Sequence, residues 1–345
     1  MLYRSRVLAL SCLLVVISFL ILAPAARAQG PYHVAAQWKV GGSSWWDYMA
    51  VDPASHLLYV THGNQVVVVE PSGKVKDRMA GFKGLHGVAF DTSGKYGFLS
   101  DGGADQVVIF NRKTRAIVAR VPAGKNPDGL TFDPYSKTAW AFNGRSNTAT
   151  VVSDATHKVV ATVALPGRPE FPVADGRGYV YDNIESLSKI VKIDATTHKV
   201  LAAWSIAPCE GPSGLAIDVA HHRLFSVCHN GKMAVVNTDT GKVVAIVPIG
   251  KGPDAARFDP KHQLAFSSNG QGTLTVAHED SPDKYTVVQT LSTKRGARTM
   301  ALNLDNGTIY ADTADFGPAP KLKPGQHWAR PSLIPGSFTV LEIKR

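Results

Sequence analysis

The sequence predicts an all-β fold in which seven four-stranded sheets surround one axis. A short motif recurs seven times at a nearly constant spacing, and each repeat divides into four stretches rich in β-branched residues. No stretch shows the sustained 3.6-residue period of an amphipathic helix. Because one small sheet cannot bury both of its faces alone, several such sheets must pack face to face. We therefore expect a seven-bladed β-propeller.

The repeated motif is a short apolar stretch that ends in an acidic residue. Its clearest copy is Gly129-Leu130-Thr131-Phe132-Asp133-Pro134, and Gly87–Asp91 and Gly214–Asp218 resemble it closely. We use the final aspartate, or the asparagine in its place, as a marker. The markers lie 39 to 44 residues apart, which is the length of a four-stranded blade, and they are Asp52, Asp91, Asp133, Asp175, Asp218, Asp259 and Asn303.

The third repeat shows how one blade divides into strands. We expect its innermost strand at Gly129–Phe132, and the next three at Lys137–Asn143, Thr148–Ser153 and Val159–Leu165. Gly, Pro, Asn and Asp separate these stretches, as is typical of tight turns between strands. Each repeat therefore supplies one complete antiparallel sheet.

The two ends of the chain are predicted to share the last blade. The seventh repeat ends at Phe338–Ile343, which has the pattern of a third strand. Tyr32–Val40 precedes the first repeat and resembles the fourth strands of the others. Pairing these two segments would hide two sheet edges and close the ring. Residues 29–345 then form a single propeller domain.

Residues 1–28 are predicted to be a cleavable signal peptide. Arg4 and Arg6 precede the apolar run Val7–Leu22, and Ala26-Arg27-Ala28 has small residues where a signal peptidase needs them. We expect a periplasmic or secreted protein that has no membrane span once this segment is removed. An uncleaved membrane anchor is the alternative.

The basic charge does not indicate a nucleic-acid site. Removing residues 1–28 lowers the formal charge from +10 to +7, and the remaining Lys and Arg residues are scattered through turns. No run of five or six basic residues occurs. The pattern favours a solvated basic surface, and DNA binding remains an alternative that is not favoured. We expect a monomer.

The repeats resemble the YVTN family of β-propeller repeat proteins. Leu58-Tyr59-Val60-Thr61 is a near copy of the motif that names the family, with His62 in place of its asparagine. Val191–Val200 and Val235–Val243 are similar to the second half of the family's repeat. The resemblance covers nearly all of residues 29–345 and implies an exported propeller. It implies no reaction, because a fold does not determine an activity.

One position in each repeat points to a shared site. In a propeller the innermost strands all start at the same mouth of the central channel, so residues at equivalent positions there converge. Five residues before each marker the chain has Asp47, His86, Asp128, Glu170, Ser213, Asp254 and Arg298. Loops on the same face add the candidate ligand residues Asn143, Arg145, Asn183 and His229.

Converging carboxylates repel one another, so they must pair with cations, bind a metal ion or take up protons. We therefore predict that a small polar ligand or a protein partner binds at this mouth, although a hydrated channel with no ligand would show the same pattern. A divalent cation is one alternative occupant. Its oxygen ligands would be Asp47, Asp128, Glu170 and Asp254, and His62, His86 and His229 would offer nitrogen to a softer metal.

Catalytic signatures are absent from the sequence. It contains no G-x-S-x-G, H-E-x-x-H, P-loop or C-x-x-C motif. A non-enzymatic role is therefore favoured. The alternative is a lactonase-like hydrolase or a lyase on the same ring, for which the candidate catalytic residues are His86, Asp128, Glu170 and Arg298.

Three further features carry predictions. Cys209 and Cys228 fall on one face of the fifth blade and are predicted to form a disulfide, with two free thiols as the alternative.

Trp45 and Trp46 are expected to pack between blades rather than stack on a ligand. The proline-rich insertion at 313–336, which includes Lys321, Lys323, His327, Trp328 and Arg330, is expected to lie over the mouth as a basic lid or as a passive flap.

Overall fold

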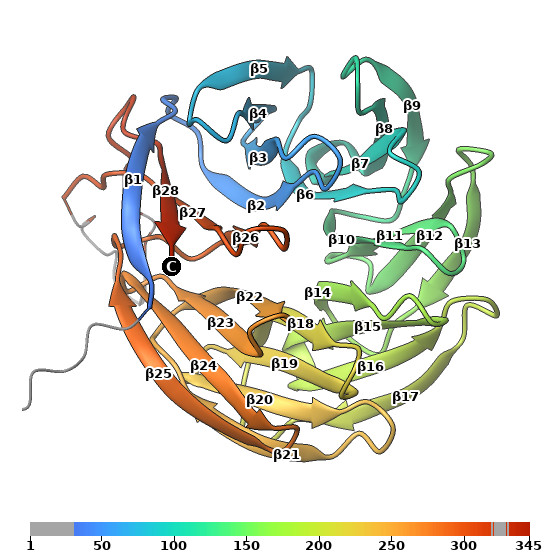
Figure 1. Ribbon diagram of the computed structural model, residues 1–345. Coiled ribbons are helices and arrows are strands. Elements are labelled where there is room, and N and C mark those ends of the chain that lie inside the picture. Colours follow the sequence, from blue (N-terminus) through green and yellow to red (C-terminus); the bar gives the residue numbers. More distant parts are fainter. Residues whose placement is uncertain (1–30, 319, 321–328, 330) are drawn as a thin grey trace, which may run out of the picture.

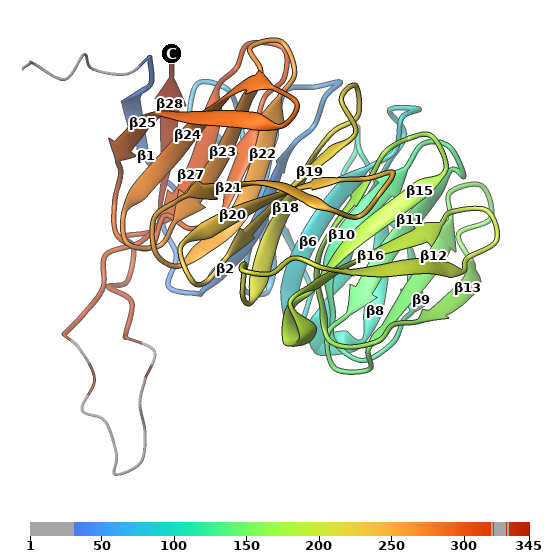
Figure 2. The ribbon, with the colours of Figure 1, turned by 90° about the horizontal axis from the view of Figure 1, so that it is seen from below.

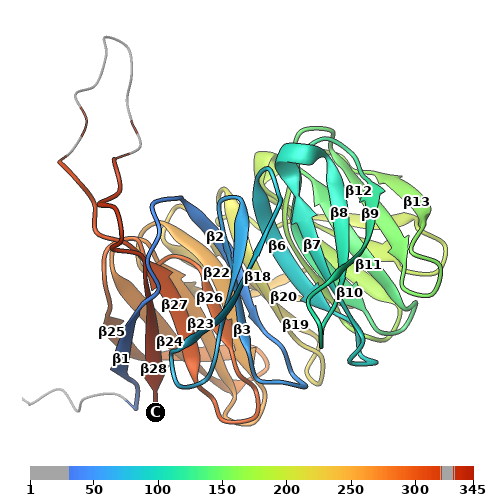
Figure 3. The same cartoon turned by 90° about the horizontal axis from the view of Figure 1, so that it is seen from above.

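Seven four-stranded antiparallel sheets surround a central axis in the computed structural model, which describes residues 31–318, 320, 329 and 331–345 (Figure 1). The prediction of a seven-bladed β-propeller is confirmed. Side views show the inner strands side by side through the thickness of the disc (Figures 2 and 3). The predicted signal peptide at 1–28 lies outside the described residues.

The first three blades follow one another along the chain, each with its innermost strand first. Blade 1 contains β2 (Trp46–Val51), β3 (Leu58–His62), β4 (Gln65–Val69) and β5 (Val75–Ala80). Blade 2 contains β6 (Leu85–Phe90), β7 (Tyr96–Asp101), β8 (Gln106–Asn111) and β9 (Ile117–Pro122). Blade 3 contains β10 (Pro127–Asp133), β11 (Thr138–Asn143), β12 (Thr148–Ser153) and β13 (Val159–Ala164).

The next three blades repeat this order. Blade 4 contains β14 (Pro169–Ala174), β15 (Tyr179–Ile184), β16 (Lys189–Asp194) and β17 (Val200–Ser205). Blade 5 contains β18 (Pro212–Asp218), β19 (Arg223–Cys228), β20 (Lys232–Asn237) and β21 (Val243–Pro248). Blade 6 contains β22 (Pro253–Asp259), β23 (Leu264–Asn269), β24 (Thr273–Ser281) and β25 (Lys284–Ser292). The helices among the described residues are two single 3₁₀ turns, η1 (Gly102–Ala104) and η2 (Glu185–Leu187).

Blade 7 is built from both ends of the chain, as predicted. It contains β26 (Met300–Leu302), β27 (Ile309–Thr313), β28 (Thr339–Lys344) and, as its outermost strand, β1 (His33–Lys39). β1 pairs with β28 in antiparallel register, with Trp38 opposite Val340. The side chain of Gln289 in blade 6 then accepts from the Tyr32 amide at 2.9 Å and donates to the Tyr32 carbonyl at 2.7 Å.

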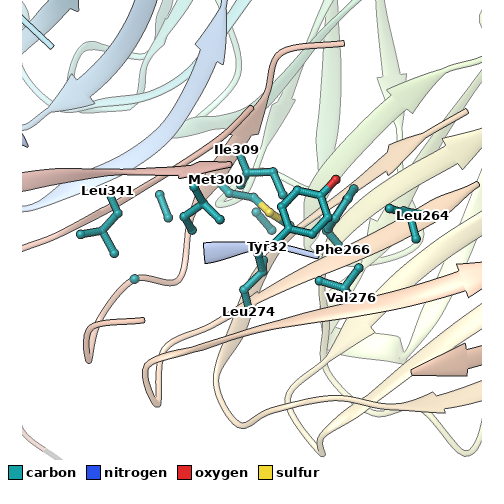
Figure 4. Close-up of a cluster of buried hydrophobic side chains, with 12 residues drawn as sticks. Tyr32, Leu264, Phe266, Leu274, Val276, Met300, Ile309 and Leu341 are labelled. Atoms are coloured by element: carbon teal, nitrogen blue, oxygen red, sulfur yellow. The ribbon is translucent and has the colours of Figure 1, made fainter. Parts of the chain in front are cut away.

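The hydrophobic core lies between neighbouring blades. Figure 4 shows one such cluster, in which Tyr32, Phe266, Leu274, Ile309 and Leu341 from blades 6 and 7 pack together. The two middle strands of a blade, such as β11 and β12, are almost fully buried, the innermost strand β10 is only partly buried at several positions, and the outermost strand β13 is mostly exposed. This gradient explains the high content of β-branched residues in the inner strands.

The tryptophans of blade 1 are packing residues, as expected. Trp46 is 3% exposed and lies 5.3 Å from Phe338, ring centroid to ring centroid. Trp45 stacks on Trp46 at 5.6 Å and contacts Phe316 at the base of the insertion. These contacts tie blade 1 to blade 7.

The marker aspartates hold the turn that follows each innermost strand. Asp52 accepts hydrogen bonds from the amide of Ala54 at 2.8 Å and from the hydroxyl of Ser55 at 2.9 Å. Arg112, which directly follows the third strand of blade 2, forms ion pairs with Asp52 and, at 3.0 Å, with Asp91. One buried guanidinium therefore neutralises the markers of two adjacent blades.

Cys209 and Cys228 form the predicted disulfide. The bond lies in the interior of blade 5, where both residues are completely buried. It joins the segment before β18 to the end of β19, so it fixes the innermost strand of this blade at the mouth that carries the predicted site.

Candidate functional site

The predicted site residues converge on one mouth of the central channel. In six blades they lie at an irregularity of strand register, such as the one between Leu85 and Val88 or between Pro127 and Leu130. A β-bulge turns a side chain away from its regular direction, which here is toward the axis. We call this set the polar ring: Asp47, His86, Asp128, Glu170, Ser213, Asp254 and Arg298.

Polar side chains of neighbouring blades hold the backbone of the polar ring. Each is a donor on the second strand of one blade and bonds a ring carbonyl of the next blade. The pairs are Thr61 to His86 at 2.7 Å, Ser100 to Asp128 at 2.6 Å, Asn183 to Ser213 at 2.6 Å, and Ser268 to Arg298. The positions of the ring residues are therefore fixed before any ligand arrives.

Three residues from blades 1 to 3 form the first cluster of the ring. His86 Nδ1 lies 2.7 Å from Asp47 Oδ2 and 3.5 Å from Asp128 Oδ1. Their side chains are 20–26% exposed, so solvent reaches the cluster. Burial lowers the pKa of His86, but the charge of Asp128 and the hydrogen bond to Asp47 outweigh it and raise that pKa to about 9. The imidazole is therefore a cation at neutral pH.

The pKa of Asp128, one of the two acids of this cluster, is shifted as well. Burial, reinforced by the charges of Asp47 and Asp254, raises the pKa of Asp128 to about 7, although the positive charge of His86 opposes the shift. A carboxyl group with such a pKa exchanges its proton near neutral pH, as general acids and bases do. His86 and Asp128 thus form a partly exposed pair in which either group can carry a proton.

Blades 5 to 7 form a second cluster. Arg298 pairs with Asp254 and also donates to the carbonyl of Trp46 at 3.2 Å, and Ser213 donates to Asp254 Oδ1 at 2.6 Å. The charge of Asp254 raises the pKa of Arg298 above its ordinary range. This cluster is electrically balanced within the protein.

Glu170 meets a residue from the other side of the channel. The hydroxyl of Tyr48 in blade 1 lies 3.5 Å from Glu170 Oε1 in blade 4, and the Tyr48 ring lies edge-on to Phe171 at 5.0 Å. Burial and, next, the charge of Asp128 raise the pKa of Glu170 well above its ordinary range. The Tyr48 ring crosses the axis and forms the floor beneath the polar ring.

The predicted loop ligands lie in different surroundings. Asn143 and Asn183 are completely buried: Asn143 donates to the hydroxyls of Thr148 and Thr150, and Asn183 supports Ser213. His229 is about half exposed and lies 3.6 Å from Glu185. The structure therefore gives the two asparagines a role in holding loops rather than in facing the channel.

Arg145 lines a groove beside His86. The groove has a volume of about 580 Å³, and its charged residues are His86, Arg145, Lys125 and Asp105. Lys125 Nζ lies 2.7 Å from Asp105 Oδ2 and His86 is paired with Asp47, which leaves the guanidinium of Arg145 as the unbalanced positive charge of the groove. Sequence reasoning did not single out Lys125, because a lysine in a turn is ordinarily a solvated surface residue.

His62 lies away from the mouth. Its ring stacks on Phe338 at 4.2 Å, and burial lowers its pKa to about 4. Among the predicted metal ligands, the atoms of Asp47 and Asp128 come within 4.8 Å of each other and of His86, whereas Glu170 and Asp254 do not belong to this group. One nitrogen and two carboxylate oxygens could hold a divalent cation there only if His86 lost its proton.

The insertion at 313–336 leaves the ring at the edge formed by blade 7 (Figures 2 and 3). Its base is a short antiparallel bridge between Phe316 and Leu333, in which the Gly317 amide donates to the Ser332 carbonyl at 2.8 Å. The residues predicted to decorate a lid, Lys321, Lys323, His327, Trp328 and Arg330, lie outside the described residues.

No family model and no curated protein matches this sequence. Solved structures are similar in fold. Hydrazine synthase of Kuenenia stuttgartiensis is 16% identical, with a TM-score of 0.69 over 84% of this chain and 95% of that chain. U3-55K is 9% identical, with a TM-score of 0.73 over 90% of this chain and 98% of that chain. The WD40 repeats of RRP9 are 10% identical, with a TM-score of 0.74 over 92% of this chain and 99% of that chain.

At these identities the likeness concerns the fold alone. It supports the propeller and says nothing of what the polar ring binds. Among the described residues, no helix is long and apolar enough to cross a membrane.

The pairing of His86 should make stability depend on pH. Because the folded-state pKa of about 9 exceeds the ordinary value of 6.5, the stabilisation is complete below pH 6.5 and is lost as pH rises through 9. The shift corresponds to about 3 kcal/mol. We expect chemical denaturation of wild type and His86→Gln to differ most below pH 6.5 and to converge above pH 9. A stability difference between the two proteins that stays constant from pH 6 to pH 10 would contradict the pairing. As an independent check, Asp47→Asn should lower the midpoint of the His86 titration measured by NMR.

Proposed function

We propose that this chain is an exported YVTN-type propeller that binds a small polar ligand at its polar mouth. The observation that carries the proposal is the Asp47–His86–Asp128 cluster, in which three partly exposed polar side chains meet on a rigid ring. Such fixed, convergent polar groups are what small-molecule sites use for orientation. The signal peptide predicted at 1–28 and the family resemblance support a periplasmic or secreted location.

The surroundings of the cluster narrow the class of ligand. Carboxylates at Asp47 and Asp254 accept hydrogen bonds from hydroxyl groups, and the positive groove next to His86 and Arg145 attracts an anionic substituent. A sugar or polyol with one acidic group satisfies both features. A protein partner that presents the same groups on a loop would bind at the same mouth. Because the whole polar ring belongs to one chain, a monomer suffices to bind either the small ligand or the protein partner.

Calorimetry on the mature protein tests the proposal. A panel of neutral sugars, sugar acids and polyols, with Ca²⁺ and Mg²⁺ as separate additions, should give binding that Asp128→Asn weakens about tenfold or more. Asp239→Asn is the matched control, because Asp239 is 60% exposed and pairs with His222 on the outer surface. Wild-type protein that binds nothing in this panel, or binding that Asp128→Asn leaves unchanged, would refute the proposal.

An enzyme on the same ring is the second candidate. The pKa values of His86 and Asp128, about 9 and about 7, are suited to proton transfer near neutral pH. We expect His86→Gln to abolish any turnover of lactones or esters. If the wild-type protein binds ligands but turns none of them over, binding is the only role that the data support. Absence of turnover in wild-type protein across the panel would reject the hydrolase.

A further inference from the structure

The end of the central channel opposite the polar ring contains a cavity of about 410 Å³. It lies beyond Tyr48 and is lined by the innermost strands as they run toward the markers. Most of the residues that line it have apolar side chains, and Phe90, Phe132, Phe171 and Phe258 contribute aromatic rings. Arg257 is the only charged residue in the lining.

Arg257 has few partners for a largely buried arginine. Its Nη1 donates to the carbonyl of Ala256 at 2.7 Å, and its guanidinium lies over the ring of Phe171 at 5.1 Å. Within the described part of the chain no carboxylate forms an ion pair with it. A guanidinium has five N–H donors, so one hydrogen bond to a carbonyl uses only a small part of its capacity.

Other arginines of this propeller differ in this respect. Arg112 is almost fully buried and pairs with Asp52 and Asp91, and Arg298 pairs with Asp254. A buried charge without a counterion is unfavourable, and burial here lowers the pKa of Arg257 to about 10. The protein therefore supplies a counterion for the arginines of its blade junctions and its polar ring but none for the one in the aromatic cavity.

We propose that this cavity binds a small molecule with an apolar or aromatic body and one carboxylate. The carboxylate would pair with Arg257, and the body would lie against Phe90, Phe132 and Phe258. A single guanidinium suits a monoanion better than a phosphate dianion, which needs more donors. The volume is that of an ordinary small-molecule site. Water around Arg257, with no ligand, is the competing explanation.

Binding of 4-phenylbutyrate, decanoate and indole-3-acetate, with 4-phenylbutyramide as the uncharged analogue, tests this site. We expect the mature protein to bind at least one acid, to bind the amide about tenfold more weakly, and to lose affinity for the acid about tenfold in Arg257→Met. Arg177→Met is the matched control, because Arg177 is exposed and outside the cavity lining. Arg257→Lys should retain part of the binding.

Two results would overturn the inference. One is that wild-type protein binds none of the three acids by calorimetry and saturation-transfer NMR. The other is that Arg257→Met, folded by circular dichroism, binds the acid as wild type does. Asp128→Asn should leave acid binding unchanged, so failure of the polar mouth as a site and failure of this cavity are distinguishable.

A different cluster lies at the junction of blades 5 and 6. His221 Nδ1 lies 2.8 Å from Asp218 Oδ2 and 2.9 Å from Glu279 Oε1, and all three atoms are within 4.8 Å of one another. The side chains of Asp218 and Glu279 are 3% and 0% exposed. Neither oxygen of Glu279 accepts a hydrogen bond of good geometry. Two buried acids thus face one imidazole.

Comparison between repeats shows why this cluster is exceptional. Glu279 lies 20 residues after the marker of its own blade, and Arg112 lies 21 residues after the marker of blade 2. Both reach the marker of the preceding blade, Asp52 for Arg112 and Asp218 for Glu279. Where blade 2 places a cation against a buried carboxylate, blade 6 places a second carboxylate. Among the described residues, the basic group that faces both carboxylates is the single imidazole of His221.

We propose that Asp218, His221 and Glu279 bind a divalent transition-metal ion such as Zn²⁺. Carboxylate oxygen and imidazole nitrogen are both among the ligands that Zn²⁺ accepts, and the separations of 2.8 and 2.9 Å bring the ligand atoms close enough to share one ion. His221 is 38% exposed, which leaves a position for water and a path for entry. The role of such an ion would be to tie blade 6 to blade 5.

Zinc titration of EDTA-treated mature protein tests this site. We expect one equivalent by mass spectrometry of metal content and a raised melting temperature, both lost in His221→Ala and in Glu279→Gln. His262→Ala is the matched control, because His262 pairs with its marker Asp259 at 2.7 Å in the same way without a third ligand. Asp128→Asn removes a ligand of the polar mouth and should keep the zinc. The proposal fails if the wild type takes up no zinc, or if both site variants retain it.

Discussion

The pairing of β1 with β28 is the interaction on which both ends of the channel depend. Six blades are formed by continuous stretches of chain, but blade 7 is complete only when residues separated by about the whole domain meet. Its completion places Arg298 between Asp254 of blade 6 and the Trp46 carbonyl of blade 1. An open ring would leave the first and last blades free to move apart, and no two groups on the axis would keep a fixed separation.

The repeat predicted most of this architecture because it is a local signal. The spacing of the markers defined the blades, the unpaired third strand at Phe338–Ile343 indicated closure, and the equivalent positions of Asp47, His86 and Asp128 predicted that they would meet. The disulfide followed from the same reasoning, since Cys209 and Cys228 belong to one blade. Each inference needed only the position of a residue within its blade.

What the repeat could not predict is how individual side chains use their space. Asn143 and Asn183 occupy the mouth in sequence position, yet each turns inward to bond a neighbouring hydroxyl or carbonyl. The hydroxyl of Tyr48 reaches Glu170 on the opposite side of the channel, because the bulge at Trp46–Met49 redirects β2. The sequence did not indicate a role for Arg257, because this residue lies inside a typical copy of the repeated motif. Only the assembled ring shows that no carboxylate of the described residues forms an ion pair with it.

The charged groups in the interior and at the mouth differ in how far other residues of the protein neutralise them, and this difference separates structural from binding roles. Arg112 with its two markers, and Arg298 with Asp254, are balanced within the chain and need nothing further. In the His86 cluster the charges of the imidazole and the carboxylates offset one another, but the side chains are partly exposed. A polar ligand must therefore compete with the pairs that His86 forms with Asp47 and Asp128, so these contacts contribute more to specificity than to affinity. Within the described residues Arg257 has no carboxylate partner, and the two buried acids Asp218 and Glu279 share the single imidazole of His221. Buried groups of that kind are costly to fold, so an external ion or ligand that completes them stabilises the folded state as it binds.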